Sequence, residues 1–227
     1  MRSKFFAKSA ASLVALGALA LVGAAQAGVI VSAVSVTASS NNPTPGFGDA
    51  INLINQGGLA TGYTSGVTDF ATYLGGNPQH TILSAGAEWF TDFNVTSATV
   101  NFDLGTVLTI ASVAAWVDEF WGAGKIEVLL STNNTTFTSA GSFAPTDWAV
   151  SVPSYSADVF SFAATSARYV RLFLSGCPQP LSQSGGGCGL GEVAFEAVAN
   201  RVPEPGSMAL AGLALAGLAA TRRRKAS

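Results

Sequence analysis

The middle of the chain alternates between apolar and polar residues in short runs, a period of two that is typical of β-strands. Residues 108–117 are instead almost continuously apolar, which predicts a buried strand. The clearest alternation, in residues 168–174, puts two sets of side chains on opposite faces of a strand: Val170, Leu172 and Leu174, and Tyr169, Arg171 and Phe173. No helical periodicity of useful length accompanies these runs.

The predicted strands are numerous and are separated by turn residues. They cover residues 98–104, 108–117, 126–130, a short segment from Phe137, 155–162, 168–174 and 192–198. Many short strands at fairly regular spacing predict an all-β sandwich or jelly roll. Residues 39–92 are rich in Gly, Asn and Pro, and we expect long loops there around one or two short strands.

The N-terminal residues 1–27 have the parts of a secretory signal peptide. Three basic residues precede an apolar run over residues 10–25, and residues 25–27, Ala-Gln-Ala, fit the small-x-small rule for cleavage. We therefore expect a signal helix that is removed before Gly28, and the alternative is a retained transmembrane anchor. Either way, the remainder of the chain is exported.

The C-terminal residues 201–227 contain a stiff proline motif, a short apolar helix and a basic cluster. The apolar stretch, residues 206–220, has 15 residues, fewer than the roughly 17–25 that span a bilayer. Prolines on both sides of Glu204 prevent the helix from starting earlier. The residues of the proline motif and the basic cluster are Pro203, Glu204 and Pro205, and Arg222, Arg223 and Arg224.

These three parts, in this order, closely resemble the PEP-CTERM sorting signal of Gram-negative bacteria. The resemblance implies recognition and cleavage by an exosortase-type membrane enzyme. It also implies transient residence in the inner membrane, followed by the cell surface or the extracellular space. The family is associated with extracellular polysaccharide and biofilm formation, so a polysaccharide is the expected partner.

Removing both ends leaves residues 28–200, one predicted domain with an acidic composition. It has 12 acidic residues against Lys125, Arg168 and Arg171, a formal charge of −9, whereas the whole chain has −2. Nucleic acid is excluded as a partner because phosphate contacts require clustered Lys and Arg. An acidic surface rich in Ser, Thr, Asn and Gly suits neutral ligands or cations.

The two cysteines, Cys177 and Cys188, lie in a segment rich in Gly, Pro and Ser. Export places them in an oxidising compartment, so we predict a disulfide between them. Free thiols or metal ligands are the alternative, and no His or third Cys lies nearby in the sequence.

A second resemblance rests on the order of several sequence blocks across residues 34–198. These blocks are residues 36–40 (VTASS), 50–55 (AINLIN), 57–59 (GGL), 100–105 (VNFDLG), 126–131 (IEVLLS) with Phe137, 167–172 (ARYVRL) and 189–195 (GLGEVAF). Their order resembles the discoidin, or coagulation-factor type C, family. That resemblance implies the galactose-binding-like jelly-roll β-sandwich.

Sugar-binding members of this fold commonly hold one structural calcium ion beneath the loops. By position, the resemblance assigns the calcium ligands to Asn55, Gly58, Thr61 and Glu192. The family usually has Asp-Gly where this chain has Asn55-Gln56-Gly57, and an amide in place of a carboxylate weakens a calcium site. The alternative is that Glu192 only pairs with Arg168 or Arg171.

Sugars bind to aromatic faces in loops, and this chain has five candidates. They are Tyr63, Trp89, Phe120, Trp121 and Trp148. The alternative for each is packing in the core, where large aromatic residues are usually found.

Catalytic motifs are absent from the sequence. His80 has no local partner motif, and Glu88, Asp92, Asp118 and Glu119 are the acidic residues from which a glycosidase pair could be drawn. We expect these four instead to form a solvated face. The sequence is thus interpreted as a non-enzymatic, exported, carbohydrate-binding β-sandwich. A structural or adhesive matrix protein that binds other proteins is the alternative, and a glycoside hydrolase is a weaker one.

Overall fold

The structure is a computed structural model that describes residues 28–182 and 186–198. The predicted signal peptide and sorting segment lie outside these residues. The described elements are β1 (Val29–Val31), β2 (Ser35–Ala38), the 3-10 helix η1 (Ala50–Leu53), α1 (Phe70–Gly75), β3 (Gln79–Thr81), β4 (Trp89–Phe90), β5 (Ser97–Val117), β6 (Lys125–Ser131), β7 (Thr138–Phe143), β8 (Ser154–Ser156), β9 (Asp158–Ser175) and β10 (Gly189–Val198). Neither described helix has the length and apolar character that crossing a membrane requires.

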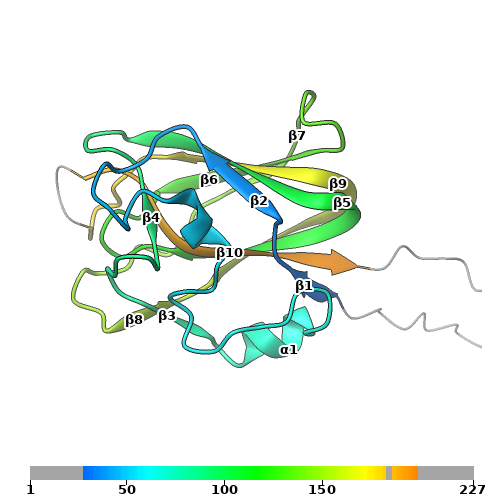
Figure 1. Ribbon diagram of the computed structural model, residues 1–227, viewed down its shortest axis with the longest axis horizontal. Coiled ribbons are helices and arrows are strands. Elements are labelled where there is room, and N and C mark those ends of the chain that lie inside the picture. The colour runs from blue at the N-terminus through cyan, green and yellow to red at the C-terminus, as the bar shows by residue number, and fades with distance from the viewer. Residues whose placement is uncertain (1–27, 183–185, 199–227) are drawn as a thin grey trace, which may run out of the picture.

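Two long strands, β5 and β9, pair with each other and run through both layers of the sandwich (Figure 1). The first half of β5 pairs with β2, and its second half pairs with β10. Between them the β5–β9 pairing shifts register after Asp103, next to Gly105, whose φ of +80° favours glycine. The sequence predicts two strands, 98–104 and 108–117, where the structure has one bent strand, because a glycine at a bulge also looks like a turn.

The main core lies between the two layers. Val170, Leu172 and Leu174 of β9 are fully buried, which confirms the face predicted from the alternation. Phe102 of the first half of β5 meets Phe195 of β10 edge to face, with ring centroids 5.3 Å apart. This contact joins the two layers directly, and the strands and their pairing confirm the predicted all-β sandwich.

A second, smaller core covers the outer face of the β10 layer. Ala114 and Trp116 of β5 pack there with Ile30, Phe70 and Tyr155. Because alternate residues of β5 enter different cores, nearly the whole run 108–117 is apolar, as expected for a strand buried on both faces. The cover is formed by α1 and by the two-stranded sheet of β3 and β8 (Figure 1).

Residues 39–92 contain the predicted loops and short strands, and also two short helices that the sequence pattern does not predict. Helix α1 has six residues, too few to show a periodicity, and it begins where the Asp69 side chain accepts a hydrogen bond from the Thr72 N–H at 2.7 Å. The predicted disulfide between Cys177 and Cys188 is present and joins the segment after β9 to the start of β10.

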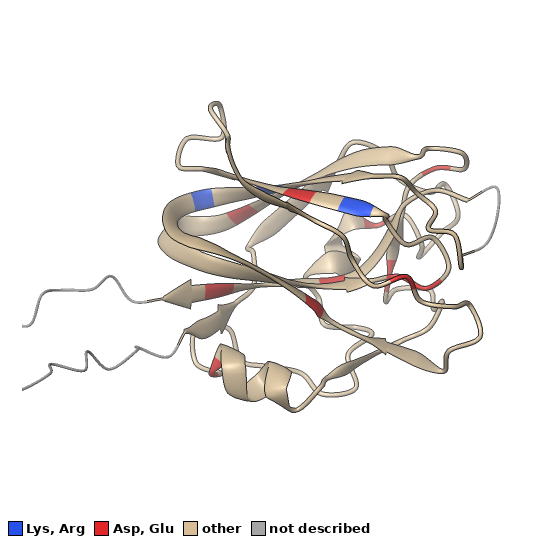
Figure 2. Ribbon diagram, turned by 180° about the vertical axis from the view of Figure 1, so that it is seen from behind, with Lys and Arg blue, Asp and Glu red and all other residues tan. Residues whose placement is uncertain are grey.

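The described charges are distributed unevenly. The three basic residues lie on β6 and β9, while acidic residues are spread over the sandwich and its loops (Figure 2). Arg168 forms a two-pronged ion pair with Asp103 on the neighbouring strand, at 2.9 Å for both contacts. This pair lowers the pKa of the Asp103 carboxyl.

Candidate functional site

An aromatic pocket opens among the loops at one end of the sandwich. Its volume is about 170 Å³. It is lined by three chain segments, and the lining residues are Asn42, Thr44 and Phe47, then Leu83, Phe90 and Phe93, then Phe120 and Trp121. The loop that carries Phe120 follows the end of β5, at the end of the sandwich opposite to the last residues of β10 (Figure 1).

Trp121 is the centre of this aromatic pocket. Its ring meets Phe90 and Phe93 edge to face, at centroid separations of 5.4 Å and 5.2 Å, and stacks against Phe120 at 5.8 Å. Trp121 itself is buried, whereas Phe93 is 54% exposed and Leu83 is 44% exposed. The pocket therefore has a fixed aromatic floor and an apolar rim that a ligand can reach.

The loop of Phe120 and Trp121 is held from inside by the carboxylate that precedes it. Asp118 Oδ1 accepts hydrogen bonds from the Phe120 N–H at 2.8 Å and the Trp121 N–H at 2.6 Å. Glu119 Oε1 accepts one from the Leu83 N–H at 3.2 Å, across the pocket. An aspartate that bonds the amides after it is a common way to turn the chain at the end of a strand.

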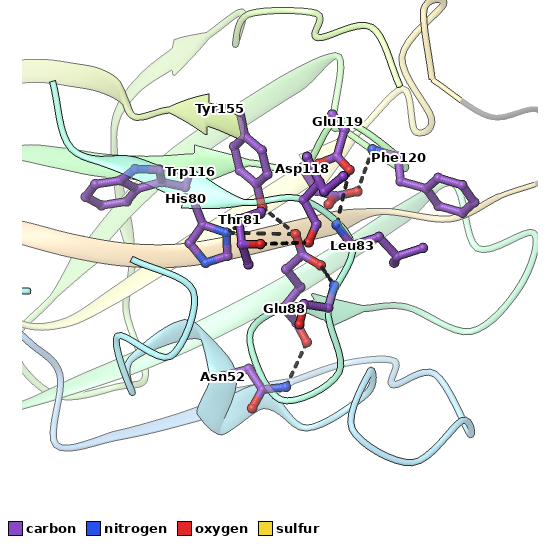
Figure 3. A network of polar contacts seen from close by, with 12 residues as sticks. Asn52, His80, Thr81, Leu83, Glu88, Trp116, Asp118, Glu119, Phe120 and Tyr155 are labelled. Atoms are coloured by element: carbon purple, nitrogen blue, oxygen red, sulfur yellow. Dashed lines mark hydrogen bonds and ion pairs between the residues drawn. The ribbon is translucent and has the colours of Figure 1, made fainter. Parts of the chain in front are cut away.

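Glu88, Asp118 and Glu119 form a buried acidic cluster, which corrects the prediction that they belong to a solvated face. Their exposed fractions are 0%, 0% and 2%, and each offers an oxygen within 4.8 Å of those of the other two. Figure 3 shows the carboxyl groups pointing toward one another from two separate loops. The sequence alone could not show this burial, because acidic side chains in loops are usually solvated. Asp92, the fourth acidic residue considered, is exposed.

Hydrogen bonds satisfy only part of this acidic cluster. Glu88 accepts from the Tyr155 hydroxyl at 2.7 Å and from the Ser84 N–H at 2.8 Å. Asp118 Oδ2 and Glu119 Oε2 are buried and have no hydrogen-bond partner in the described part of the chain. Two carboxylate oxygens are thus removed from water without a protein donor.

The environment of the acidic cluster favours uncharged groups. Desolvation, with the nearby Glu119 charge adding to it, raises the pKa of Glu88 to about 7. Desolvation and then the charges of Glu88 and Glu119 raise the pKa of Asp118 well above its usual range. Burial lowers the pKa of His80 to about 4, so at neutral pH its contact with Glu88, 3.8 Å away, is not an ion pair.

Glu192 lies in a different buried region, near the Asn55 loop, as the family resemblance implies. Its two oxygens accept from the Gln56 N–H at 2.8 Å and from the Tyr63 hydroxyl at 3.1 Å. Desolvation raises the pKa of Glu192 to about 8. Arg168 and Arg171 are not its partners, since Arg168 binds Asp103 and Arg171 lies over the Phe137 ring.

The other predicted calcium ligands also accept hydrogen bonds within the protein. Asn55 Oδ1 accepts from the Gly57 N–H at 2.7 Å, and the Gly58 carbonyl accepts from the Thr81 N–H at 2.8 Å. The Thr61 carbonyl accepts from the Tyr73 hydroxyl. Each of these oxygens keeps a second lone pair, so these bonds do not decide the matter, and calcium at these four residues stays a prediction.

The predicted ligand-binding aromatics divide into two groups. Phe120 and Trp121 lie together in the aromatic pocket. Trp89 is fully buried, and its indole N–H donates to Asn41 at 2.9 Å. Tyr63 and Trp148 pack against the second core, away from the pocket lining. Tyr63 and Trp89 are buried and Trp148 is half-buried, and ligand binding by these three residues stays a prediction.

Four apolar pocket residues are missing from the sequence prediction: Phe47, Leu83, Phe90 and Phe93. The run Trp-Phe-Thr-Asp-Phe at residues 89–93 was an available signal, because alternate residues of a short strand point to opposite sides. Trp89 enters the core there, and Phe90 enters the pocket. Phe47 and Leu83 lie in loops, where nothing in the local sequence marks a shared site.

Comparison with known proteins gives one match in sequence and several in fold. Residues 201–225 match the model of the PEP-CTERM protein-sorting motif, which confirms the predicted sorting signal. No curated protein sequence matches the chain.

Among solved structures, the chain is similar to "CBM32 of AlyQ in complex with 4,5-unsaturated mannuronic acid", at 21% identity and a TM-score of 0.47, covering 73% of this chain and 96% of that chain. It is also similar to a CBM32 of Clostridium perfringens solved with GalNAc-β-1,3-galactose, at 16% identity and a TM-score of 0.47, covering 73% and 94%. Chitosan-binding module 1 of a chitosanase/glucanase from Paenibacillus sp. IK-5 matches at 18% identity and a TM-score of 0.48, covering 73% and 95%.

Proposed function

We propose that this protein is a non-catalytic carbohydrate-binding protein that acts outside the cytoplasm and binds a neutral sugar in its aromatic pocket. The observation that supports this most directly is the fixed cluster around Trp121 with Phe93 exposed at its rim. Aromatic faces offer an apolar, rigid contact surface, which suits the C–H faces of a sugar ring. The PEP-CTERM motif supports an exported protein, processed by an exosortase-type enzyme.

The size and charge of the pocket narrow the ligand class. At about 170 Å³ it is smaller than the roughly 300–1,000 Å³ of typical small-molecule sites, so we expect it to hold one sugar residue of a longer chain. The acidic domain disfavours uronic acids and sulfated sugars, because like charges repel. We therefore expect the ligand to be a neutral sugar residue in the extracellular polysaccharide that the cell itself produces.

A hydrolase is less well supported. Glycosidase carboxyl groups flank the sugar bond that they cleave. Here the three clustered carboxyl groups are buried behind the pocket wall, where they hold the backbone of the lining loops. A sugar in the aromatic pocket would contact aromatic rings, Leu83 and the polar Asn42 and Thr44.

A glycan array tests the proposal, using the full chain in a detergent without a sugar headgroup. Phe93→Ala removes an exposed ring at the pocket rim, and we expect affinity for the best neutral glycan to fall about tenfold, equivalent to about 1.4 kcal/mol. Phe173→Ala is the matched control, because Phe173 is 39% exposed on β9, outside the pocket lining. Absence of glycan binding, or equal affinity of Phe93→Ala and the unchanged protein, would contradict the proposal.

A further inference from the structure

We propose that Glu88, Asp118 and Glu119 bind a divalent cation of the calcium type, directly beneath the aromatic pocket. This site is separate from the calcium site that the family resemblance implies at Glu192. The proposal depends on the buried carboxyl groups alone and does not depend on carbohydrate binding.

The spacing of the acidic cluster fits one ion. Ca²⁺ binds oxygen at about 2.3–2.6 Å, so two ligands on opposite sides of the same ion are separated by at most about 4.6–5.2 Å. The three carboxyl groups each offer an oxygen within 4.8 Å of the others. Carboxylate oxygens are the ligands that hard cations such as Ca²⁺ prefer.

The unsatisfied oxygens supply the second argument. Asp118 Oδ2 and Glu119 Oε2 are buried without a donor in residues 28–182 and 186–198. A buried polar atom without a partner costs about 1–3 kcal/mol, and more when it is charged. Native proteins rarely leave such atoms unsatisfied, and a cation bound by both carboxyl groups would compensate them.

Charge balance supplies the third argument. The nearest base that the structure describes is His80, whose Nδ1 lies 3.8 Å from Glu88, beyond hydrogen-bonding distance, and 2.8 Å from the Thr81 carbonyl. Arg168 pairs with Asp103, and Arg171 lies over Phe137, so neither compensates the cluster. Buried charges are normally paired or bound to a metal. A proton shared between Glu88 and Asp118 is the competing explanation, and the experiment separates the two.

A bound cation would act on the aromatic pocket. Asp118 holds the amides of Phe120 and Trp121, and Glu119 holds the amide of Leu83 on the opposite wall. Fixing both carboxyl groups with one ion would fix both walls relative to each other. The site therefore has a structural role beneath the ligand surface.

The test is calorimetric titration of the chelator-treated full chain with Ca²⁺, in the absence of any glycan. We expect Asp118→Asn and Glu119→Gln each to weaken binding at least tenfold. Glu192→Gln is the matched control, because it changes an equally buried carboxyl in the other region and should leave this binding event unchanged. Loss of binding only in Glu192→Gln, or no Ca²⁺ binding by the unchanged protein, would overturn the proposal.

A measurement on the unchanged protein keeps the test valid if the variants fold poorly. Amide resonances of the ¹⁵N-labelled chain are followed while Ca²⁺ is added. The amides of Leu83, Phe120 and Trp121 should shift, because their acceptor carboxylates would bind the ion, whereas that of Gln56 should not. Shifts confined to Gln56 and its neighbours would assign the ion to Glu192 and overturn the proposal.

Discussion

Two buried acidic regions, one around Glu192 and one formed by the acidic cluster, differ in how completely they are bonded. In the Glu192 region, both carboxylate oxygens accept a hydrogen bond. In the acidic cluster, two of the carboxyl groups each have an oxygen without a donor.

Burial is equal in the two regions, so burial does not explain the difference. The pKa values of Glu192 and Glu88 are both raised, and desolvation is the largest cause for each. What differs is the supply of donors, since the Glu192 region is complete with protein groups alone. The bonds of Glu192 hold the Asn55 loop in place, whereas the acidic cluster leaves two oxygens for the cation proposed above.

The largest expected effect is on the pH dependence of stability in the presence of a chelator. Glu192 has a folded-state pKa of about 8 against an ordinary value of 4.5, so the folded state keeps a proton that the unfolded state has lost. That stability is fully present below about pH 4.5 and is lost as pH rises through 8. Each such group contributes at most about 1.4 kcal/mol per pH unit, so the free energy of unfolding should fall by on the order of 3 kcal/mol between pH 5 and pH 8.

Urea unfolding at several pH values measures this, and two variants divide the effect between the regions. Glu192→Gln should remove the part that belongs to Glu192, and Glu88→Gln the part that belongs to the acidic cluster. Asp69 and Asp103, whose pKa values are lowered, act with the opposite sign at lower pH. His80, whose pKa is lowered to about 4, also acts with the opposite sign up to about pH 6.5, which reduces the fall without reversing it. A free energy of unfolding that rises between pH 5 and pH 8 would contradict the inferred protonation of both regions.

The second-largest expected effect comes from removing the hydrogen bonds that Glu192 accepts. Glu192→Ala leaves the Gln56 N–H without an acceptor and takes one partner from the Tyr63 hydroxyl, so we expect it to cost about 2 kcal/mol. Glu127→Ala on β6 is the control, because Glu127 is only half-buried, and its cost should be below about 0.5 kcal/mol. Chemical denaturation of both variants in chelator measures the difference, and equal costs would mean that the Glu192 bonds contribute little.

The smallest expected effect is an increase in stability. In chelator at pH 8, Asp118→Asn should raise the free energy of unfolding by about 1 kcal/mol, because the amide keeps Oδ1 as an acceptor and replaces an unsatisfied oxygen by a donor. In saturating Ca²⁺ the order should reverse, since the variant has lost a cation ligand. Thermal unfolding under both conditions measures this, and destabilisation of the variant in chelator would show that Asp118 is already satisfied.

Much of the fold was predictable because it depends on periodicity along single strands. Alternation at 168–174 identified the buried face of β9, and the apolar run 108–117 identified the strand that contacts both cores. The disulfide followed from export and from the presence of only two cysteines. The bend of β5 was not predictable, because a bulge at Gly105 and a turn at Gly105 have the same local sequence.

The site was predictable only in part because it is assembled from distant segments. Phe120 and Trp121 were found as adjacent aromatics in a loop, but Phe47 and Leu83 join them only through the packing of the loops. The acidic cluster was misread for the same reason. Glu88 and Asp118 are thirty residues apart, and their shared burial depends on Tyr155 and the two-stranded sheet that covers them.

The placement of the last strand determines which way the aromatic pocket faces. β10 begins beside the pocket loops and ends at Val198, at the opposite end of the sandwich, just before the sorting motif. Its ten residues span about 33 Å at the usual rise of a strand. The aromatic pocket and the residue that leads into the sorting motif therefore lie at opposite ends of the domain.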